Sequence, residues 1–283
     1  MTAARPLLVV GGGKMGGALM AGWIGRGISA ADIFVVEPNP DNASALARDL
    51  GVTVAAMADD LPPDLLPELV MFAVKPQVMA DVVPAYLPFA GPSTVFLSIA
   101  AGTPIALFED CLGEVAAIVR VMPNTPAAVG RGASVACANA RVTDAQQKLC
   151  HDLLTAVGQV HWVEDEDLLH AVTGLSGSGP AYVFHLVECL ARAGREAGLP
   201  EDLANSLARA TVEGAGELLH RSATDTPDTL RRNVTSPGGT TAAGLTVLMG
   251  GDPNKGDPAN GPLGDLVTDC VAAAARRSRE LAE

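Results

Sequence analysis

A glycine-rich turn directly after the first apolar run is the feature that most constrains the fold of this chain. The run Leu7–Val10 leads into Gly11-Gly12-Gly13-Lys14-Met15-Gly16, which fits the pattern G-x-G-x-x-G at Gly11, Gly13 and Gly16. In a strand–turn–helix unit the first glycine permits a tight turn, the second lets the backbone approach a pyrophosphate, and the third lets helix and strand pack closely. The helix that follows directs its N–H groups toward the phosphates. The pattern predicts a dinucleotide-binding site; a glycine-rich turn selected for packing alone is the alternative.

Short apolar runs recur through the first half of the chain and alternate with segments of helical period. Such runs suit strands that are buried on both faces of a parallel sheet. The further runs are Ile33–Val36, Val70–Val74, Val95–Ile99 and Ala116–Val119, and the helical segments include Leu19–Ile24 and Ala43–Leu50. Because strand–helix–strand order implies right-handed crossovers, we expect a doubly wound α/β sheet.

The second half of the chain consists mainly of long helical stretches, which are Tyr182–Ala197, Leu203–Leu219 and Val267–Leu281. A length of 283 residues corresponds to about two domains. We predict an α/β dinucleotide-binding domain over residues 1–164 and an all-α domain over residues 165–283. The helices are apolar on more than one face, which predicts that two protomers pack them together. The segment Gly250–Gly264, rich in glycine and proline, is typical of a loop.

Charge and cysteine content exclude several classes of protein. Lysine and arginine number 19 and aspartate and glutamate 32, so the net charge is −13. Nucleic acids and anionic membranes require a basic surface, and neither is expected as a partner. No apolar run is long enough to span a membrane, and the histidines and cysteines show no metal-ligand spacing. Five scattered cysteines are typical of reduced thiols, so we expect a cytoplasmic protein without a metal.

Residues at the ends of the expected strands are candidates for the cofactor site. Glu37 follows the second run about 20 residues after the glycines, where an acidic residue can bind ribose hydroxyls and repel a 2′-phosphate. This favours NADH over NADPH; a solvated turn carboxylate is the alternative. Lys75, in Ala73–Pro76, is either a ligand contact or a surface lysine. The small residues of Ser98–Gly102 allow close approach of a flat ring, although small residues also occur for packing alone.

Three motifs, two in the second half of the chain and one shortly before it, are candidates for the substrate site. Thr235–Thr241 reads Thr-Ser-Pro-Gly-Gly-Thr-Thr, in which Ser236 as N-cap and the following proline predict a helix start with free N–H groups for a carboxylate. An ordinary capped helix is the alternative. Gly174–Tyr182 opens the first long helix and permits close approach of another element. Met122–Pro126 forms a rigid turn in which Asn124 shapes either the site or the turn itself.

Taken in order, these motifs resemble one family closely. Gly-x-Gly-x-Met-Gly, Ala-Val-Lys-Pro, Ser-Ile-Ala-Ala-Gly, Arg-x-Met-Pro-Asn-Thr-Pro, Gly-Leu-Ser-Gly-Ser-Gly-Pro-Ala-Tyr and Ser-Pro-Gly-Gly-Thr-Thr succeed one another along the chain. The chain resembles the pyrroline-5-carboxylate reductases, from Leu8 to about Leu281. The glycine pattern is shared by many dehydrogenases, whereas the last two motifs together are far more specific.

The resemblance implies a Rossmann domain followed by an all-α domain that dimerises by interleaving, with a homodimer or a decamer as the assembly, the latter a ring of dimers. It implies the reduction of L-1-pyrroline-5-carboxylate to L-proline with NADPH or NADH. The cofactor residues it implies are Val10, Gly11, Gly12, Gly13, Lys14, Met15, Gly16, Glu37, Ala73, Val74, Lys75, Pro76, Ile99, Ala100, Ala101 and Asn233. The substrate residues it implies are Glu166, Ser236, Gly238, Gly239, Thr240 and Thr241, with Thr241 as the catalytic hydroxyl nearest the imine.

Two departures from the family pattern bear on function. Glu37 stands where NADPH-preferring members often have serine or threonine, and the Gly250–Gly264 loop is longer and richer in proline than the family's turn. The alternatives are another small imine or hydroxy-acid reductase of the same two-domain type and a non-catalytic nucleotide sensor. The hydroxy-acid enzymes usually place a lysine on the first helix of the second domain, and Tyr182–Ala197 contains none.

Overall fold

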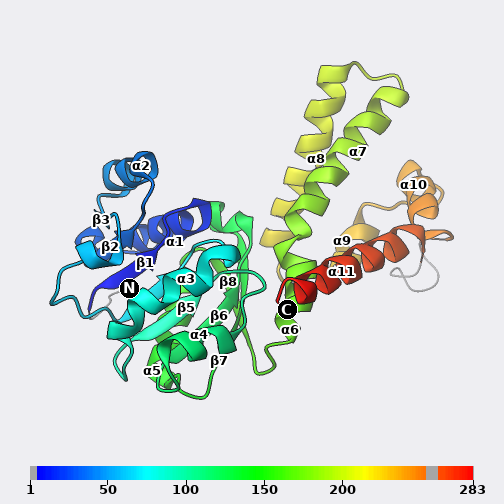
Figure 1. Ribbon diagram of the computed structural model, residues 1–283. Coiled ribbons are helices and arrows are strands. Elements are labelled where there is room, and N and C mark those ends of the chain that lie inside the picture. The colour runs from blue at the N-terminus through cyan, green and yellow to red at the C-terminus, as the bar shows by residue number, and fades with distance from the viewer. Residues whose placement is uncertain (1–4, 253–260, 283) are drawn as a thin grey trace. The chain divides into compact units, whose positions relative to one another are not determined.

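The computed structural model describes residues 5–252 and 261–282. The chain divides into two compact units (Figure 1). The first contains the described residues up to Gly177 together with those from Ala274 onward, and the second is Ser178–Ala273. The domain boundary between residues 164 and 165 stays a prediction. Residues 253–260 of the predicted Gly250–Gly264 loop lie outside the described residues.

The first unit is built on one eight-stranded sheet with the order β3-β2-β1-β4-β5-β6-β7-β8. Its strands are β1 (Leu7–Val10), β2 (Ile33–Val36), β3 (Thr53–Ala55), β4 (Leu69–Phe72), β5 (Val95–Ser98), β6 (Ala117–Met122), β7 (Gly132–Ala138) and β8 (Gly158–Val163). All neighbours pair in parallel except β6 and β7, which are antiparallel. The expected doubly wound sheet is confirmed, and it carries one antiparallel connection that the apolar runs did not predict. The order reverses between β1 and β4, which is where an open α/β sheet binds its ligand.

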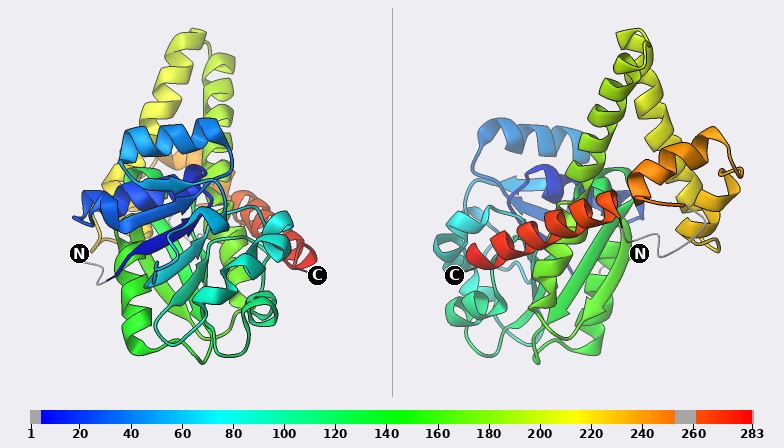
Figure 2. Two further views of the ribbon diagram at one scale, coloured as in Figure 1. Left: turned by 60° about the vertical axis from the view of Figure 1, so that its left-hand side comes forward. Right: turned by 90° about the vertical axis from the view of Figure 1, so that its right-hand side faces the viewer.

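Both faces of this sheet are covered by helices (Figure 2). Along β1, Leu7 and Val9 enter one apolar cluster and Leu8 and Val10 the other, because successive side chains point to opposite faces. The first cluster packs under α1 (Lys14–Gly25) and α5 (Asp144–Thr155), where the indole N–H of Trp23 donates to the Leu153 carbonyl oxygen at 2.9 Å. The second packs under α3 (Met79–Val82) and α4 (Ile105–Leu112). Continuous apolar runs therefore form the strands because neither face meets water.

The helices of the first unit are short and those of the second are long. The α-helices are α1 (Lys14–Gly25), α2 (Pro40–Leu50), α3 (Met79–Val82), α4 (Ile105–Leu112), α5 (Asp144–Thr155), α6 (Leu168–Val172), α7 (Gly179–Glu196), α8 (Glu201–Arg221), α9 (Pro227–Asn233), α10 (Thr240–Met249) and α11 (Pro262–Glu280). The 3₁₀ turns are η1 (Ala30–Asp32), η2 (Ala58–Asp60), η3 (Pro76–Val78), η4 (Val83–Phe89) and η5 (Thr125–Val129), and η6 (Thr173–Gly177) is a π-helical turn.

The second unit is helical throughout its described residues, as expected. The predicted helices at 182–197, 203–219 and 267–281 correspond to α7, α8 and α11. Helices α7 and α8 pack together as a hairpin, and the last turns of α11 belong to the first unit (Figure 1). No helix among residues 5–252 and 261–282 is both long and apolar enough to cross a membrane.

Candidate functional site

The predicted cofactor residues of the first unit gather along one row at the carboxyl ends of four strands. Val10 is in register with Val36 and Phe72, and Phe72 with Ser98. The residues that directly follow these strand ends therefore lie side by side. Backbone hydrogen bonds continue between them beyond the last residues of the strands. The Gly11 N–H donates to the Val36 carbonyl at 2.9 Å. The structure thus brings together Gly11–Gly16, Glu37, Ala73–Pro76 and Ile99–Ala101, which the sequence separates.

The three glycines of the pattern meet different surroundings. Gly11 has a φ of +94°, and a Cβ there would lie 2.8 Å from the Val74 Cγ1 atom. A Cβ on Gly16 would lie 2.6 Å from the Gly11 carbonyl oxygen. Both positions need glycine for the turn and for packing. A Cβ on Gly13 would meet nothing within 4 Å, so the second glycine faces open space that a ligand can occupy.

Helix α1 begins without a side chain over its N-terminus. Gly13 is its N-cap, no side-chain capping bond is present, and its first turn holds no acidic residue. Lys14, the first helical residue, is exposed. Free N–H groups, the positive end of the helix dipole and a nearby ammonium group together attract an anion such as a pyrophosphate.

Glu37 is held by three donors at the end of β2. Its Oε2 atom accepts from the Gly12 N–H and from the Asn42 side-chain amide, both at 2.9 Å. Its Oε1 atom accepts from the Asn39 N–H at 3.0 Å. The residue is 8% exposed. A solvated turn carboxylate, the alternative interpretation of Glu37, does not describe this arrangement.

A pocket of about 400 Å³ opens beside Glu37 at the ends of β1, β2 and β4. Val10, Val36, Val74 and other apolar side chains line it, and Asp81 is the one charged residue among the described residues in its wall. Tyr86, also in the wall, is buried, and burial raises the pKa of its hydroxyl above the usual range. An apolar slot at this edge of the sheet suits a flat aromatic base.

Lys75 and the segment Ile99–Ala101 complete the row. Lys75 is exposed at the start of η3, with Pro76 at the first helical position. Ala100 is buried, whereas Ile99 and Ala101 are half-buried, so small side chains and backbone form this part of the crevice.

The predicted substrate residues Ser236–Thr241 form a tight turn followed by a helix start in the second unit. The Gly239 N–H donates to the Ser236 carbonyl at 3.0 Å, with Pro237 and then Gly238 (φ +69°) between them. Proline followed by a glycine at positive φ is the signature of a type II turn. The prediction that Ser236 caps the helix is wrong, because this turn delays the helix and Gly239 is its N-cap.

The N-terminus of α10 carries neither a side-chain cap nor an acidic residue in its first turn. Thr240 and Thr241 are the first two helical residues, and both are exposed. Two hydroxyls beside uncapped N–H groups can hold a carboxylate and a ring nitrogen. Asn233, the last residue of α9, is also exposed in this unit.

Glu166 lies in an ion pair that the sequence did not predict. Its Oε1 atom accepts from the Arg120 guanidinium at 2.6 Å and from the Ile105 N–H at 2.9 Å. The Arg120 side chain is 5% exposed and that of Glu166 is 30% exposed. The pair therefore ties the start of α4 to β6, and Glu166 keeps part of its surface open.

Two further polar contacts of the first unit involve His170 and Asn124. The His170 Nδ1 atom lies 2.9 Å from the Ser278 hydroxyl, and both residues are buried. The His170 pKa is lowered by burial first, then by Arg120 and Arg279. Asn124 accepts from the Ala133 N–H at 2.8 Å and donates to the Ser176 carbonyl at 3.0 Å, so it joins the turn before η5 to the π-helical turn η6. None of these partners could be found from motif spacing.

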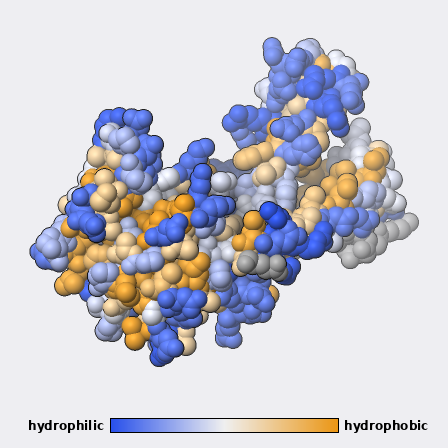
Figure 3. All heavy atoms as spheres, in the orientation of Figure 1, coloured by the Kyte–Doolittle hydropathy of each residue, from blue (hydrophilic) through white to orange (hydrophobic). Residues whose placement is uncertain are grey.

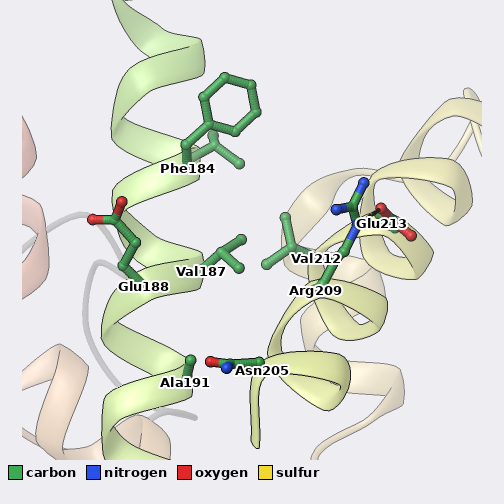
Figure 4. Close-up of a pocket in the computed structure, with 9 residues that line it drawn as sticks. Phe184, Val187, Glu188, Ala191, Asn205, Arg209, Val212 and Glu213 are labelled. Carbon is green, nitrogen blue, oxygen red and sulfur yellow. Dashed lines mark hydrogen bonds and ion pairs between the residues drawn. The ribbon is translucent and has the colours of Figure 1, made fainter. Parts of the chain in front are cut away.

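Many large apolar side chains of the second unit are exposed. In the view of Figure 3 the tip of the α7–α8 hairpin is mostly hydrophilic, and hydrophobic residues of this unit show toward α10 and α11. A groove of about 460 Å³ runs between α7 and α8, where Val187 and Val212 point toward one another (Figure 4). Phe184 on its edge is 64% exposed, and on α10 Val247 is 73% exposed. Faces of this kind mark surfaces that another protein chain covers.

Comparisons with known proteins agree with both units. A family model described as pyrroline-5-carboxylate reductase dimerisation matches residues 166–281, and one described as NADP oxidoreductase, coenzyme F420-dependent, matches residues 7–102. A pyrroline-5-carboxylate reductase of Pseudomonas aeruginosa is 39% identical over 274 residues, which cover 97% of this chain and 96% of the relative.

Solved structures of similar proteins cover the whole length of the chain. A pyrroline-5-carboxylate reductase from Coxiella burnetii has a TM-score of 0.88 at 31% identity and covers 99% of this chain and 100% of its own. A pyrroline carboxylate reductase from Plasmodium falciparum, solved with NADP bound, has a TM-score of 0.80 at 29% identity and covers 100% of both chains.

Proposed function

The chain belongs to the pyrroline-5-carboxylate reductase family, and we propose from this premise that it reduces L-1-pyrroline-5-carboxylate to L-proline, the last step of proline biosynthesis. The reductant is NADH or NADPH. One observation carries the proposal: the same chain combines two features. Residues 166–281 match the dimerisation domain of the family, and the strand ends of the first unit form a crevice suited to a dinucleotide. The family relationship selects the substrate, because the crevice alone would fit many dehydrogenases.

The residues of the first unit fit a nicotinamide dinucleotide. The open space at Gly13 and the uncapped start of α1 suit the pyrophosphate, and the apolar pocket beside Val36 suits the adenine. Lys75 and Ile99–Ala101 would border the remaining half of the cofactor. When bound, the reduced nicotinamide supplies a hydride for the imine carbon.

At the substrate end, the turn Ser236–Gly239 and the start of α10 would bind the carboxylate. Thr241 would then donate or accept a hydrogen bond at the ring nitrogen, and Asn233 would contact the cofactor. Glu166 would reach the substrate through the exposed part of its carboxyl group. These assignments support a mechanism in which acceleration comes from holding the reacting carbons together.

Reduction of the imine consumes one hydride at carbon and one proton at nitrogen. A neutral threonine hydroxyl is a poor acid at neutral pH, so we assign Thr241 the role of orienting the ring nitrogen. The proton would come from the substrate, bound as its iminium form, or from water.

The chain carries the dimerisation domain of its family. We infer a homodimer in which a second copy covers the apolar faces of α7, α8 and α10, and a ring of five such dimers as the larger assembly. We also infer that the enzyme is located in the reducing cytoplasm, because its cysteines are odd in number, scattered and free.

The test is oxidation of NADH and NADPH with pyrroline-5-carboxylate, with proline measured as product. We expect Thr241→Ala to lower kcat about tenfold, the value of one lost hydrogen bond to the reacting group. Thr246→Ala is the matched control, since Thr246 lies exposed on the same helix and donates to the Ala242 carbonyl. No turnover with either cofactor would favour the nucleotide sensor, and normal kcat in Thr241→Ala would remove Thr241 from the mechanism.

A further inference from the structure

We propose that the adenosine end of the crevice selects NADH over NADPH, and that Asn42 is the positioning residue that holds Glu37 for this selection. The proposal rests on the proposed function, in which the enzyme uses a reduced nicotinamide dinucleotide. It goes further by naming the cofactor and a residue, Asn42, that motif spacing does not mark.

The argument starts from the acceptor capacity of one carboxylate. A carboxylate offers about four acceptor positions, two on each oxygen. The Gly12 N–H and the Asn42 amide occupy Oε2, and the Asn39 N–H occupies one position on Oε1. One position on Oε1 is left. A ribose hydroxyl can donate to that position, as the acidic residue at the end of a second Rossmann strand commonly requires.

A 2′-phosphate has no comparable partner here. At neutral pH it carries close to two negative charges and acts mainly as an acceptor. Glu37 can offer it only a second negative charge, and like charges in contact are strongly unfavourable. Because three donors fix the nearly buried Glu37 side chain, the carboxylate cannot turn aside without leaving those donors unpaired.

Neither the segment that follows Glu37 nor the described lining of the adjoining pocket provides a compensating cation. The segment that follows it reads Pro38-Asn39-Pro40-Asp41-Asn42, with one acidic residue and no basic one. In the adjoining pocket, the charged residue among the described lining is Asp81, also acidic. A site for a 2′-phosphate would need an arginine or a lysine at this point.

Asn42 connects the selecting carboxylate to the glycine turn. Its side-chain amide donates to the Glu37 Oε2 atom at 2.9 Å and to the Gly12 carbonyl at 3.2 Å. Its backbone N–H is held in turn by the Asn39 side chain at 3.0 Å. Asn42 lies in the first turn of α2, so this helix fixes Glu37 relative to the pyrophosphate-binding turn.

The direct test is calorimetric titration of the full-length enzyme with ADP-ribose and with 2′-phospho-ADP-ribose. Both probes lack nicotinamide, so the readout does not depend on turnover. We expect ADP-ribose to bind at least about tenfold more tightly than its 2′-phosphate. Equal affinity, or tighter binding of the phosphorylated probe, would overturn the proposal.

Two variants of Glu37 show whether the charge or the size of its side chain causes the preference for ADP-ribose. In Glu37→Ser the preference should fall to about unity or reverse, because the repelling charge is gone. Glu37→Gln keeps the size of the side chain and serves if the serine variant does not fold; it should also lose most of the preference. A preference unchanged in the folded Gln variant would show that Glu37 does not select the cofactor.

Asn42→Ala tests the positioning role. We expect the ratio of the two dissociation constants to fall about threefold to tenfold, the equivalent of one weakened hydrogen bond. Ser44→Ala is the control, since Ser44 lies on the same helix and its hydroxyl donates to the Pro40 carbonyl. A loss of thermal stability in Asn42→Ala without a change in the ratio would reduce Asn42 to a structural residue.

The two proposals fail in different ways. Tight binding of ADP-ribose without turnover of pyrroline-5-carboxylate would contradict the reaction and leave the cofactor selection standing. Turnover that is more efficient with NADPH, together with tighter binding of 2′-phospho-ADP-ribose, would contradict the selection alone.

Discussion

The two units differ in how they bury their apolar residues. In the α/β unit the strands β1, β4 and β5 are almost entirely inaccessible, because helices from the same chain cover both faces of the sheet. In the described part of the second unit, the buried apolar residues are Ala191, Ala204 and Ala208, while leucines, valines and Phe184 remain exposed.

This difference predicts different requirements for the proposed cofactor residues and for the proposed substrate residues. The proposed cofactor residues from Val10 to Ala101 all lie in the unit that has its own core, and the hydrogen bonds that hold Glu37 are formed within it. The turn Ser236–Thr241 lies in a unit whose helices lack a large core of their own, so its position depends on what covers those helices. Cofactor binding should therefore tolerate loss of the dimer better than substrate binding does.

The largest expected effect comes from opening a cavity in the self-contained unit. Phe72 lies in β4, with ring centroids 5.4 Å from Tyr86 and 5.5 Å from Phe108. Phe72→Ala should cost about 3–5 kcal/mol of the free energy of unfolding and lower Tm by about 10 °C. Calorimetry measures the loss. If Tm changed by only a degree or two, the idea that this unit is stabilised by its own core would be wrong.

The next largest effect is expected on the strength of the dimer, from a substitution in the second unit. A charge at Phe184, on the edge of the groove between α7 and α8, should oppose burial against a second copy. We expect Phe184→Glu to weaken the dimer about 100-fold, the effect of losing one aromatic hot-spot contact. Sedimentation velocity over a range of concentrations measures the dissociation constant.

The control for that prediction is Arg192→Ala. Arg192 lies on α7 and its side chain is 69% exposed, with an ion pair to Glu196 at 3.9 Å, and such pairs contribute little. A dimer of normal strength in Phe184→Glu would mean that this face packs against something other than a second copy.

Much of the fold follows from apolar runs, and the exceptions have physical reasons. Strands β1, β2, β4, β5 and β6 are predicted because their residues are buried on both faces. β3 has three residues, too few for a pattern to be recognised. β7 consists mainly of small residues and β8 alternates between exposed and half-buried positions, so neither forms a continuous apolar run.

The candidate site likewise has parts that could be predicted from the sequence and parts that could not. The glycine turn and the strand ends follow from local sequence, because consecutive residues build them. The partners of Glu37 and Glu166 do not, because these pairs depend on how distant segments meet: Arg120 lies 46 residues before Glu166. Even Asn42, only five residues after Glu37, acquires its role from the turn at Gly12.

The smallest expected effect concerns the junction of α6 with the end of α11, which belongs to the self-contained unit. His170 is buried against Ser278, and burial together with Arg120 and Arg279 lowers its pKa despite the opposing effect of Asp167 and Glu166. A histidine whose pKa is lower in the folded state stabilises the fold above its unfolded pKa of about 6.5, and that stability is lost as the pH falls through the folded pKa. Calorimetry between about pH 8 and pH 5 should show a loss of Tm that is smaller in His170→Asn, which keeps a polar side chain but does not titrate. Equal losses in both proteins would mean that acid acts elsewhere, and that the end of α11 is held independently of the charge on His170.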